Sequence, residues 1–213
     1  MTVKRPTAIL ALLVISVAIN YLDRGALSIS APVLSQELRL APAQLGLVFS
    51  AFFWSYASFQ LVAGWMVDRF PVKWVYAAGY LVWSLATAAV GFIDTLPWLL
   101  AARMVLGVGE SVAYPACSKI LARDFPEDRR GFANALVDAG SKIGPALSTL
   151  VGGLLVVHFG WRALFVGVGL GSLLWLVPWV VLAQPESKPM VRSQTHVRGG
   201  ATFCGGGKRG VPR

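Results

Sequence analysis

The sequence is poor in charged residues and in cysteine. Of its 213 residues, 14% are charged and 56% are hydrophobic, and the mean hydropathy is +0.64. A soluble domain is usually about a quarter charged, so this composition argues against a soluble domain and indicates an integral membrane protein. The two cysteines, Cys117 and Cys204, fall in an apolar segment and in the polar C-terminal tail, which argues against a disulfide framework.

Acidic residues are scarcer than basic ones, and the imbalance is concentrated at one end. Ten acidic residues face nineteen basic ones, which gives a net charge of +9. Residues 184–213 hold six of the basic residues and one acidic residue, so the excess belongs mainly to a tail and not to a nucleic-acid surface. This Gly-rich segment has no hydrophobic period and is predicted to be disordered. It also reads like sequence that follows a frameshift.

Six apolar segments are long enough to cross a membrane as helices. We expect them at 7–30, 44–67, 72–93, 96–122, 132–158 and 161–183. The first is longer than a signal-peptide core and contains polar residues, so it is predicted to be retained. The fold prediction is therefore an all-α membrane bundle of six helices over residues 1–183, surrounded by lipid. Basic residues gather in alternate connections, and the positive-inside rule then places both termini in the cytoplasm.

Four charged residues lie inside the first and fourth segments: Asp23, Arg24, Arg103 and Glu110. Each costs about 3 kcal/mol in the hydrocarbon by insertion scales, so these side chains must face a partner or a wet cavity. Arg103 and Glu110 are seven residues apart and share one helical face. Arg24 could hold an anion, because a guanidinium matches a carboxylate, and Asp23 and Glu110 could exchange a proton. The alternative is a static salt bridge between the two helices.

Other polar residues in the apolar segments could line the same space. Tyr56 and Gln60 are four residues apart, and they could bind substrate or join helices. Tyr114 follows Glu110 by one helical turn. Asp138 and Lys142 are spaced for an ion pair within one helix, with Lys142 as an additional anion contact.

Small residues and prolines suggest how these helices pack. The pairs Gly140/Gly144 and Gly167/Gly171 have a four-residue spacing that allows close helix approach, and simple packing explains it. Pro115 and Pro145 lie inside predicted helices, and they are expected to kink or soften them.

The end of the second segment carries the pattern Gly64-x-x-x-Asp68-Arg69-x-x-x-Lys73. A glycine here allows tight helix packing, and Asp68 can pair with a cation or cap the next helix. The stretch is interpreted as a cytoplasmic latch. It resembles the loop 2–3 signature of the major facilitator superfamily, although Pro71-Val72 stands where a glycine and a basic residue are common.

Four further motifs in order resemble the anion:cation symporter branch of that superfamily. They are Asn20-Tyr21-x-Asp23-Arg24, Phe49-Ser-Ala-Phe…Tyr56…Gln60, Arg103-x-x-x-Gly107-x-Gly109-Glu110 and Phe125-Pro…Arg129-x-Gly131. The branch includes permeases for hexuronates, galactonate and glucarate. The resemblance implies that Arg24 contacts the substrate carboxylate with Tyr21, Tyr56 and Gln60 nearby. It also implies that Asp23 and Glu110 carry protons and that Arg103 couples to Glu110.

The resemblance implies twelve helices in two halves, of which this chain supplies the N-terminal one. The expected function is proton-coupled symport of organic anions in the bacterial inner membrane, driven by a proton gradient without cofactor or metal. The expected partner is the missing C-terminal six-helix half or another six-helix unit. A non-transporting fragment, an exporter or antiporter, and an intramembrane enzyme using Ser111 and His158 are the alternatives. No enzyme motif surrounds those two residues, so no enzymatic activity is expected.

Overall fold

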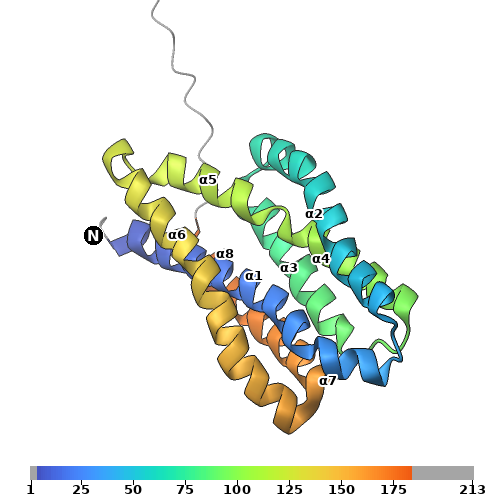
Figure 1. Cartoon of the computed structure of the whole chain (residues 1–213). Helices are drawn as coiled ribbons and strands as arrows, with labels where there is room; N and C mark the ends of the chain where they lie inside the picture. Colours follow the sequence, from blue (N-terminus) through green and yellow to red (C-terminus); the bar gives the residue numbers. More distant parts are fainter. Residues whose placement is uncertain (1–3, 184–213) are drawn as a thin grey trace, which may run out of the picture.

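The computed structural model describes residues 4–183, so the predicted tail at 184–213 lies outside the described residues. Within that range the elements are all helical, as the sequence predicts, and Figure 1 shows them as one elongated bundle. The α-helices are α1 (Lys4–Glu37), α2 (Pro42–Arg69), α3 (Val72–Val90), α4 (Leu96–Glu110), α5 (Ala113–Asp124), α6 (Glu127–Leu147), α7 (Gly153–Ser172) and α8 (Leu176–Leu182). A π-helical turn, Ser148–Gly152, links α6 to α7, and a 3₁₀ turn, Leu173–Trp175, links α7 to α8.

These elements make the six predicted passes. Helices α1, α2 and α3 are one pass each, and α4 with α5 is the fourth. The fifth runs from α6 into α7 and stops at Gly160, whose φ of 81° reverses the chain inside α7. Positive φ is a conformation that glycine adopts without strain. The rest of α7 and α8 form the sixth pass.

Hydropathy agrees with this arrangement for most of the chain. Among the described residues, four stretches are long and apolar enough to cross a membrane: Pro6–Glu37, Pro42–Arg69, Leu96–Asp124 and Glu127–Leu182. The last contains two passes, because the chain turns at Gly160. Helix α3 is not among these four stretches, and it buries the aromatic side chains of Tyr76, Tyr80 and Trp83.

Both predicted proline effects are seen. The fourth pass breaks at Ser111–Val112, and Pro115 lies in the first turn of α5, where its missing N–H leaves the carbonyl four residues earlier without a helical donor. The fifth pass changes to a π-helix shortly after Pro145, and Thr149 Oγ1 donates a hydrogen bond to the Pro145 carbonyl at 2.9 Å.

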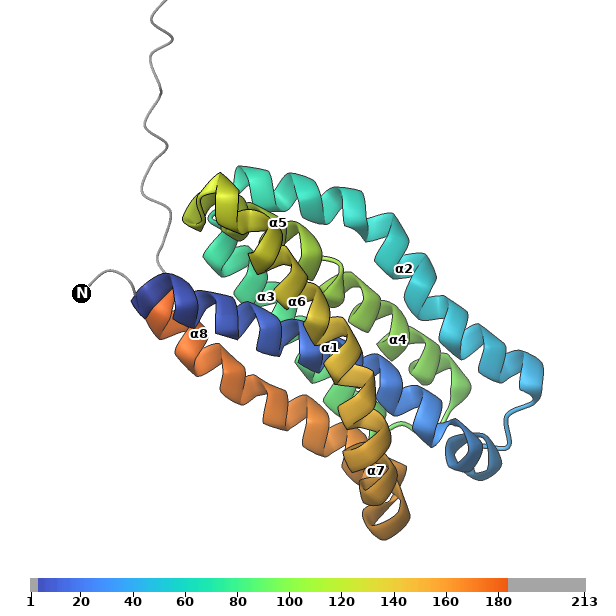
Figure 2. The same cartoon turned by 60° about the vertical axis from the view of Figure 1, so that its left-hand side comes forward.

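Helix α1 packs along α6, and α2 packs along α4, as Figures 1 and 2 show. A Cβ on Gly140 would lie 2.7 Å from the Val14 carbonyl oxygen, and one on Gly144 would lie 2.8 Å from Tyr21 Cβ. The predicted close approach at this glycine pair is therefore confirmed, and it brings Tyr21 and its neighbours against α6.

The same prediction is wrong for the other glycines. Apart from the neighbouring turns of the same helix, no atom of the described chain lies within 4 Å of a Cβ built on Gly167, Gly171 or Gly64. Gly167 and Gly171 face outward on α7, where Leu170, and Leu174 in the 3₁₀ turn that follows, are large exposed side chains. Spacing alone does not tell which side of a helix meets a neighbour.

An aromatic stack lies between α3, the 3₁₀ turn and α8. The rings of Tyr80 and Trp175 are 4.2 Å apart and those of Trp175 and Trp179 are 5.0 Å apart. The indole N–H of Trp175 donates to the Leu12 carbonyl at 2.9 Å. Buried aromatic rings with satisfied N–H groups fix α1, α3 and α8 to one another.

Candidate functional site

An ion pair joins α1 to α4 in the interior of the bundle. Arg24 Nε donates to Glu110 Oε2 at 2.8 Å. The Glu110 side chain is fully buried, whereas 19% of the Arg24 side chain is exposed. The prediction that charges of the first and fourth passes meet is confirmed, and Arg24 is the member of the pair that a solute can reach.

The other two charges, Asp23 and Arg103, lie beside this pair and are 1% and 3% exposed. Asp23 interacts electrostatically with Glu110, Arg103 and Arg24. Within the described chain, no hydrogen bond of good geometry is made by either Asp23 carboxylate oxygen, by Arg103 Nε and Nη1, by Arg24 Nη2 or by Glu110 Oε1. The polar side chains of Thr87 and Asn20 lie near Asp23 and Glu110, respectively. Buried polar groups are normally bonded, so such a concentration of unsatisfied atoms points to a functional site.

Aromatic rings surround the Arg24 guanidinium. Its Cζ lies 4.8 Å from the ring centroid of Tyr21, 4.9 Å from that of Phe52 and 4.8 Å from that of Tyr56. Arg103 Cζ lies 5.1 Å from the same Phe52 ring. These distances are within the range of cation–π attraction, so the rings hold both arginines without neutralising their charge.

The predicted tyrosines on α1 and α5 form a contact at the edge of this cluster. Tyr114 Oη donates to Tyr21 Oη at 3.2 Å, and both residues are half-buried. Gln60, one turn beyond Tyr56 on α2, has its Oε1 buried without a partner among the described residues. Three of the predicted tyrosines, Tyr21, Tyr56 and Tyr114, thus lie at the Arg24 guanidinium or beside a ring that contacts it.

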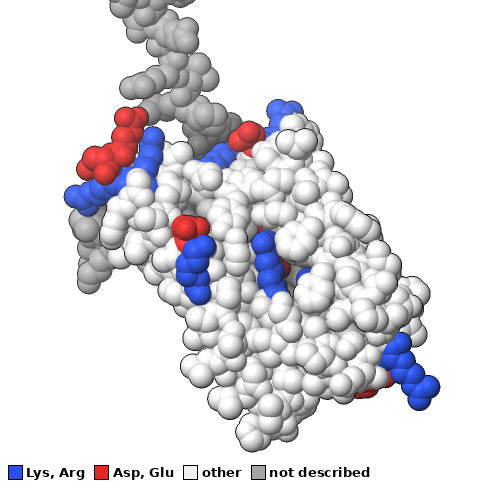
Figure 3. Space-filling model, viewed as in Figure 1, with Lys and Arg blue, Asp and Glu red and all other residues white. Residues whose placement is uncertain are grey.

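The predicted pair between Asp138 and Lys142 is wrong. No ion pair joins these two described residues, and Ser141 Oγ donates to Asp138 Oδ1 at 3.4 Å instead. Lys142 is exposed on α6 and shares no hydrogen bond with the arginines. Figure 3 shows that charged side chains gather at the two ends of this face, with a few in its otherwise uncharged middle, where the surface is hollowed.

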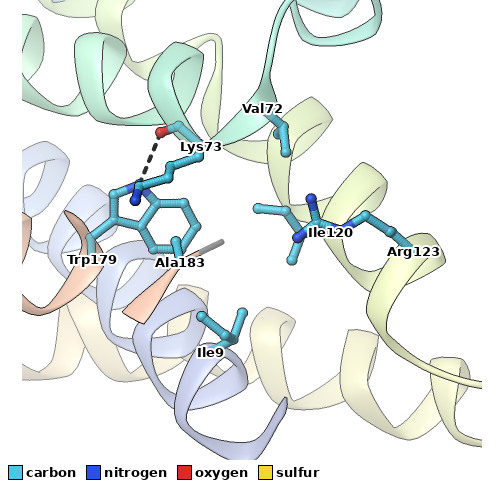
Figure 4. A pocket seen from close by; sticks show the side chains of 7 residues that line it. All are labelled: Ile9, Val72, Lys73, Ile120, Arg123, Trp179 and Ala183. Atoms are coloured by element: carbon cyan, nitrogen blue, oxygen red, sulfur yellow. Dashed lines mark hydrogen bonds between the residues drawn. The ribbon is translucent and has the colours of Figure 1, made fainter. Parts of the chain in front are cut away.

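The residues of the predicted latch do not behave alike. Asp68 and Arg69 are exposed at the end of α2, whereas Lys73 is 8% exposed. Lys73 Nζ donates to the Val180 carbonyl at 2.7 Å, near the negative end of α8. Figure 4 shows the indole of Trp179 donating to the Lys73 carbonyl, at 3.0 Å, in a small cavity of about 10 Å³. Lys73 therefore ties α3 to α8.

Sequence reasoning missed a second charged cluster at the opposite end of the bundle. Arg162, just after the Gly160 turn, pairs with Glu37 at 3.0 Å and with Asp94 at 2.5 Å. The Trp161 indole donates to Glu37 at 2.6 Å. These residues are far apart in sequence and lie in no motif, so only the fold brings them together.

Comparison with known proteins decides the family. The family model of the major facilitator superfamily matches residues 13–204. The chain belongs to the major facilitator superfamily. This family and the relatives below are transporters and not enzymes, so the intramembrane enzyme is excluded. Accordingly, Ser111 Oγ donates to the Val108 carbonyl at 2.7 Å, and His158 lies exposed on a different pass.

Several relatives of this major facilitator protein are named as anion transporters. A probable sulfoacetate transporter of Cupriavidus necator is 36% identical and aligns with 81% of this chain and 40% of its own length. A probable galactarate/D-glucarate transporter of Escherichia coli is 33% identical, over 87% and 44%. A hexuronate transporter of Bacillus subtilis is 32% identical, over 84% and 43%. The chain spans about two fifths of the length of these relatives.

Solved structures agree on the fold. A bacterial homologue of the human lysosomal transporter Spinster superposes with a TM-score of 0.78 at 21% identity, over 88% of this chain and 46% of that one. A peptide transporter in complex with sulfate superposes with a TM-score of 0.71 at 19% identity, over 81% and 37%. The described bundle therefore has the architecture of one half of a major facilitator transporter.

Proposed function

We propose that this chain forms the N-terminal half of a transporter that carries an organic anion together with a proton. The observation that supports the proposal most is the incomplete bonding of the buried cluster around Arg24. A set of two carboxyl groups and two arginines, placed where a solute reaches only one arginine, suits both anion binding and proton exchange.

Arg24 is proposed to bind the anion. Its Nε donates to Glu110, and its side chain is 19% exposed, so part of Arg24 stays within reach of a solute. A guanidinium matches a carboxylate or a sulfonate, and charge-assisted bonds of this kind are about twice as strong as neutral ones. The relatives are named for galactarate, glucarate, hexuronate and sulfoacetate, all of which carry such groups. Sugar acids are therefore the proposed substrates.

Charge balance explains why a proton would accompany the anion. With both acids ionised, Asp23 and Glu110 neutralise Arg24 and Arg103. An arriving carboxylate adds one uncompensated negative charge to a buried site, which is costly in a low dielectric. Uptake of one proton by Asp23 or Glu110 restores neutrality, and protonation of Glu110 also weakens its hold on Arg24. The two acids are so close that they titrate as a coupled set.

A second six-helix unit is the proposed partner. Arg24 and the half-buried Tyr21, Tyr56 and Tyr114 would otherwise present polar groups to lipid, which is unfavourable. In major facilitator proteins the site lies between two halves related by an axis along the membrane normal. The proposed location is the bacterial inner membrane, with both termini of the chain in the cytoplasm.

Binding measurements test this function. The purified chain, alone and co-expressed with a second six-helix unit, would be heated with galactarate, a hexuronate, sulfoacetate or a neutral polyol. We expect the acids, and not the polyol, to raise the melting temperature, and to do so more at acid pH. Equal stabilisation by acids and polyol, or by acids in an Arg24→Ala variant, would contradict the proposal. No stabilisation by any acid in either preparation would also contradict it.

A further inference from the structure

Phe52 of α2 contacts both arginines of the buried cluster. Its side chain is 1% exposed, and its ring centroid lies 4.9 Å from Arg24 Cζ and 5.1 Å from Arg103 Cζ. The ring also stacks on Tyr56, with centroids 5.5 Å apart and an interplanar angle of 23°. One buried ring is thus shared by the reachable arginine and the enclosed one.

The two arginines need such a contact because their charges are alike and both are largely removed from water. Each is attracted to the negative face of an aromatic ring, and this attraction is stronger where water is excluded. Arg24 has Glu110 as a second anchor, whereas Arg103 Nε and Nη1 have no hydrogen-bond partner in the described chain. An aliphatic side chain of similar size would fill the space but lacks the ring's electrostatic field.

We propose that Phe52 is a positioning residue for anion binding. Its ring fixes the two guanidinium groups relative to each other, so that the exposed part of Arg24 stays in place for the incoming carboxylate. Phe52 acts through the arginines and does not itself touch the anion. Because the ring leaves the charge of both arginines in place, it orients them without competing with the substrate, as an additional carboxylate would.

Fluorination of the ring tests this role, which rests on the proposed function where anion affinity is the readout. Genetic encoding would replace Phe52 by phenylalanine with one, two or three ring fluorines, which weaken the negative ring face with little change of shape. The matched control is Phe53, which meets the Phe52 ring edge-on at 5.1 Å and is 57% exposed. The probe is galactarate, and its affinity would be measured on the full chain with its six-helix partner.

We expect affinity to fall with each added fluorine at Phe52, to about fivefold for three, given the usual strength of buried cation–π contacts. The same series at Phe53 should leave affinity unchanged. A flat series at Phe52, or an equal slope at both positions, would overturn the proposal, because a ring that only fills space does not respond to its fluorine content.

A second readout needs no ligand and separates this inference from the proposed function. The arginine Nε–H signals of Arg24 and Arg103, identified by nuclear magnetic resonance of Arg24→Lys and Arg103→Lys variants, report how each guanidinium is held. Fluorination at Phe52 should shift or broaden both signals, and fluorination at Phe53 should not. If galactarate and the other acids fail to bind while these signals respond, the proposed function is wrong, whereas the ring still fixes the two arginines. Unresponsive signals would overturn the role itself.

Discussion

The two charged clusters of the molecule are built from the same residue types and differ in how completely they are bonded. At the end of the bundle, Arg162 uses Nε, Nη1 and Nη2 to bind Glu37, Asp94 and the carbonyls of Gly91 and Ile93. In the middle, Arg24 and Glu110 make one bond between them, and Arg103 and Asp23 have several unsatisfied atoms among the described residues.

The difference separates a structural cluster from a site. The end cluster joins α1, the α3–α4 connection and α7. Its acids are partly exposed, so its formation costs little desolvation free energy. The central cluster is buried, and each unsatisfied group there has a desolvation cost that the fold does not recover. Incomplete bonding, and not the presence of charge, therefore marks the place where a ligand or proton is expected to complete the structure.

Removal of each cluster's arginine gives the largest expected contrast. Arg24→Ala should weaken galactarate binding by about a hundredfold, because it removes the charge-assisted bonds to the carboxylate. Arg162→Ala should leave the affinity within about twofold, since its cluster lies at the end of the bundle, away from Arg24, and the measurement reports binding alone. Both would be measured by titration calorimetry on the full chain with its partner.

Arg24→Lys is the accompanying variant, because Arg24→Ala also leaves Glu110 buried without its partner. Lysine retains the charge and lacks the two-pronged edge, so intermediate affinity is expected. If Arg162→Ala weakens binding as much as Arg24→Ala, the division into a site and a structural cluster is wrong.

The pH dependence of binding should also differ between the clusters. If one proton enters with each anion, affinity rises by up to about tenfold for each unit of falling pH, because proton and anion binding are linked. Glu110→Gln should flatten this dependence while binding itself persists, and in a complete transporter it should abolish proton-driven uptake but spare exchange. Glu37→Gln should leave the slope intact. A slope that survives Glu110→Gln and Asp23→Asn together would exclude both acids as the proton carrier.

Thermal stability, unlike binding, should depend more on the end cluster than on the central cluster. Glu37→Ala should lower the free energy of unfolding by about 2 kcal/mol, because it removes the acceptor of Trp161 and of two Arg162 donors. Asp23→Asn should have a smaller effect, since the desolvation cost of burying the Asp23 carboxylate offsets its attraction to Arg24 and Arg103. Denaturation of the detergent-solubilised chain without ligand would measure both. A larger loss of unfolding free energy for Asp23→Asn than for Glu37→Ala would show that the interactions of the central cluster also stabilise the fold.

Much of the fold could be predicted from the sequence because bilayer thickness fixes helix length and apolar residues mark each pass. The grouping of Asp23, Arg24, Arg103 and Glu110 was also predictable, since charges inside such passes have to meet one another or water. The functional roles of these residues remain predictions.

The remainder depends on rotation and tertiary contact, which spacing does not determine. Gly140 and Gly144 face α1, whereas Gly167 and Gly171 have the same spacing and face outward. Lys142 stands one turn from Asp138 and does not pair with it. The sequence does not predict that Phe52 contacts two arginines, because a phenylalanine among apolar residues can pack against lipid or against a guanidinium, and the pattern is the same in both cases.

The smallest expected effect concerns the most exposed member of the end cluster. Asp94, whose side chain is 73% exposed, pairs with Arg162 at 2.5 Å. Asp94→Asn should lower the free energy of unfolding by about 0.5 kcal/mol at low ionic strength, and by an undetectable amount at high salt, because exposed pairs are weak and screened. The loss caused by Glu37→Ala should persist in high salt, since the bond from the buried Trp161 indole does not depend on a second charge. Equal salt sensitivity of both variants would show that simple charge attraction, and not the hydrogen bonds of Glu37, holds this end of the bundle together.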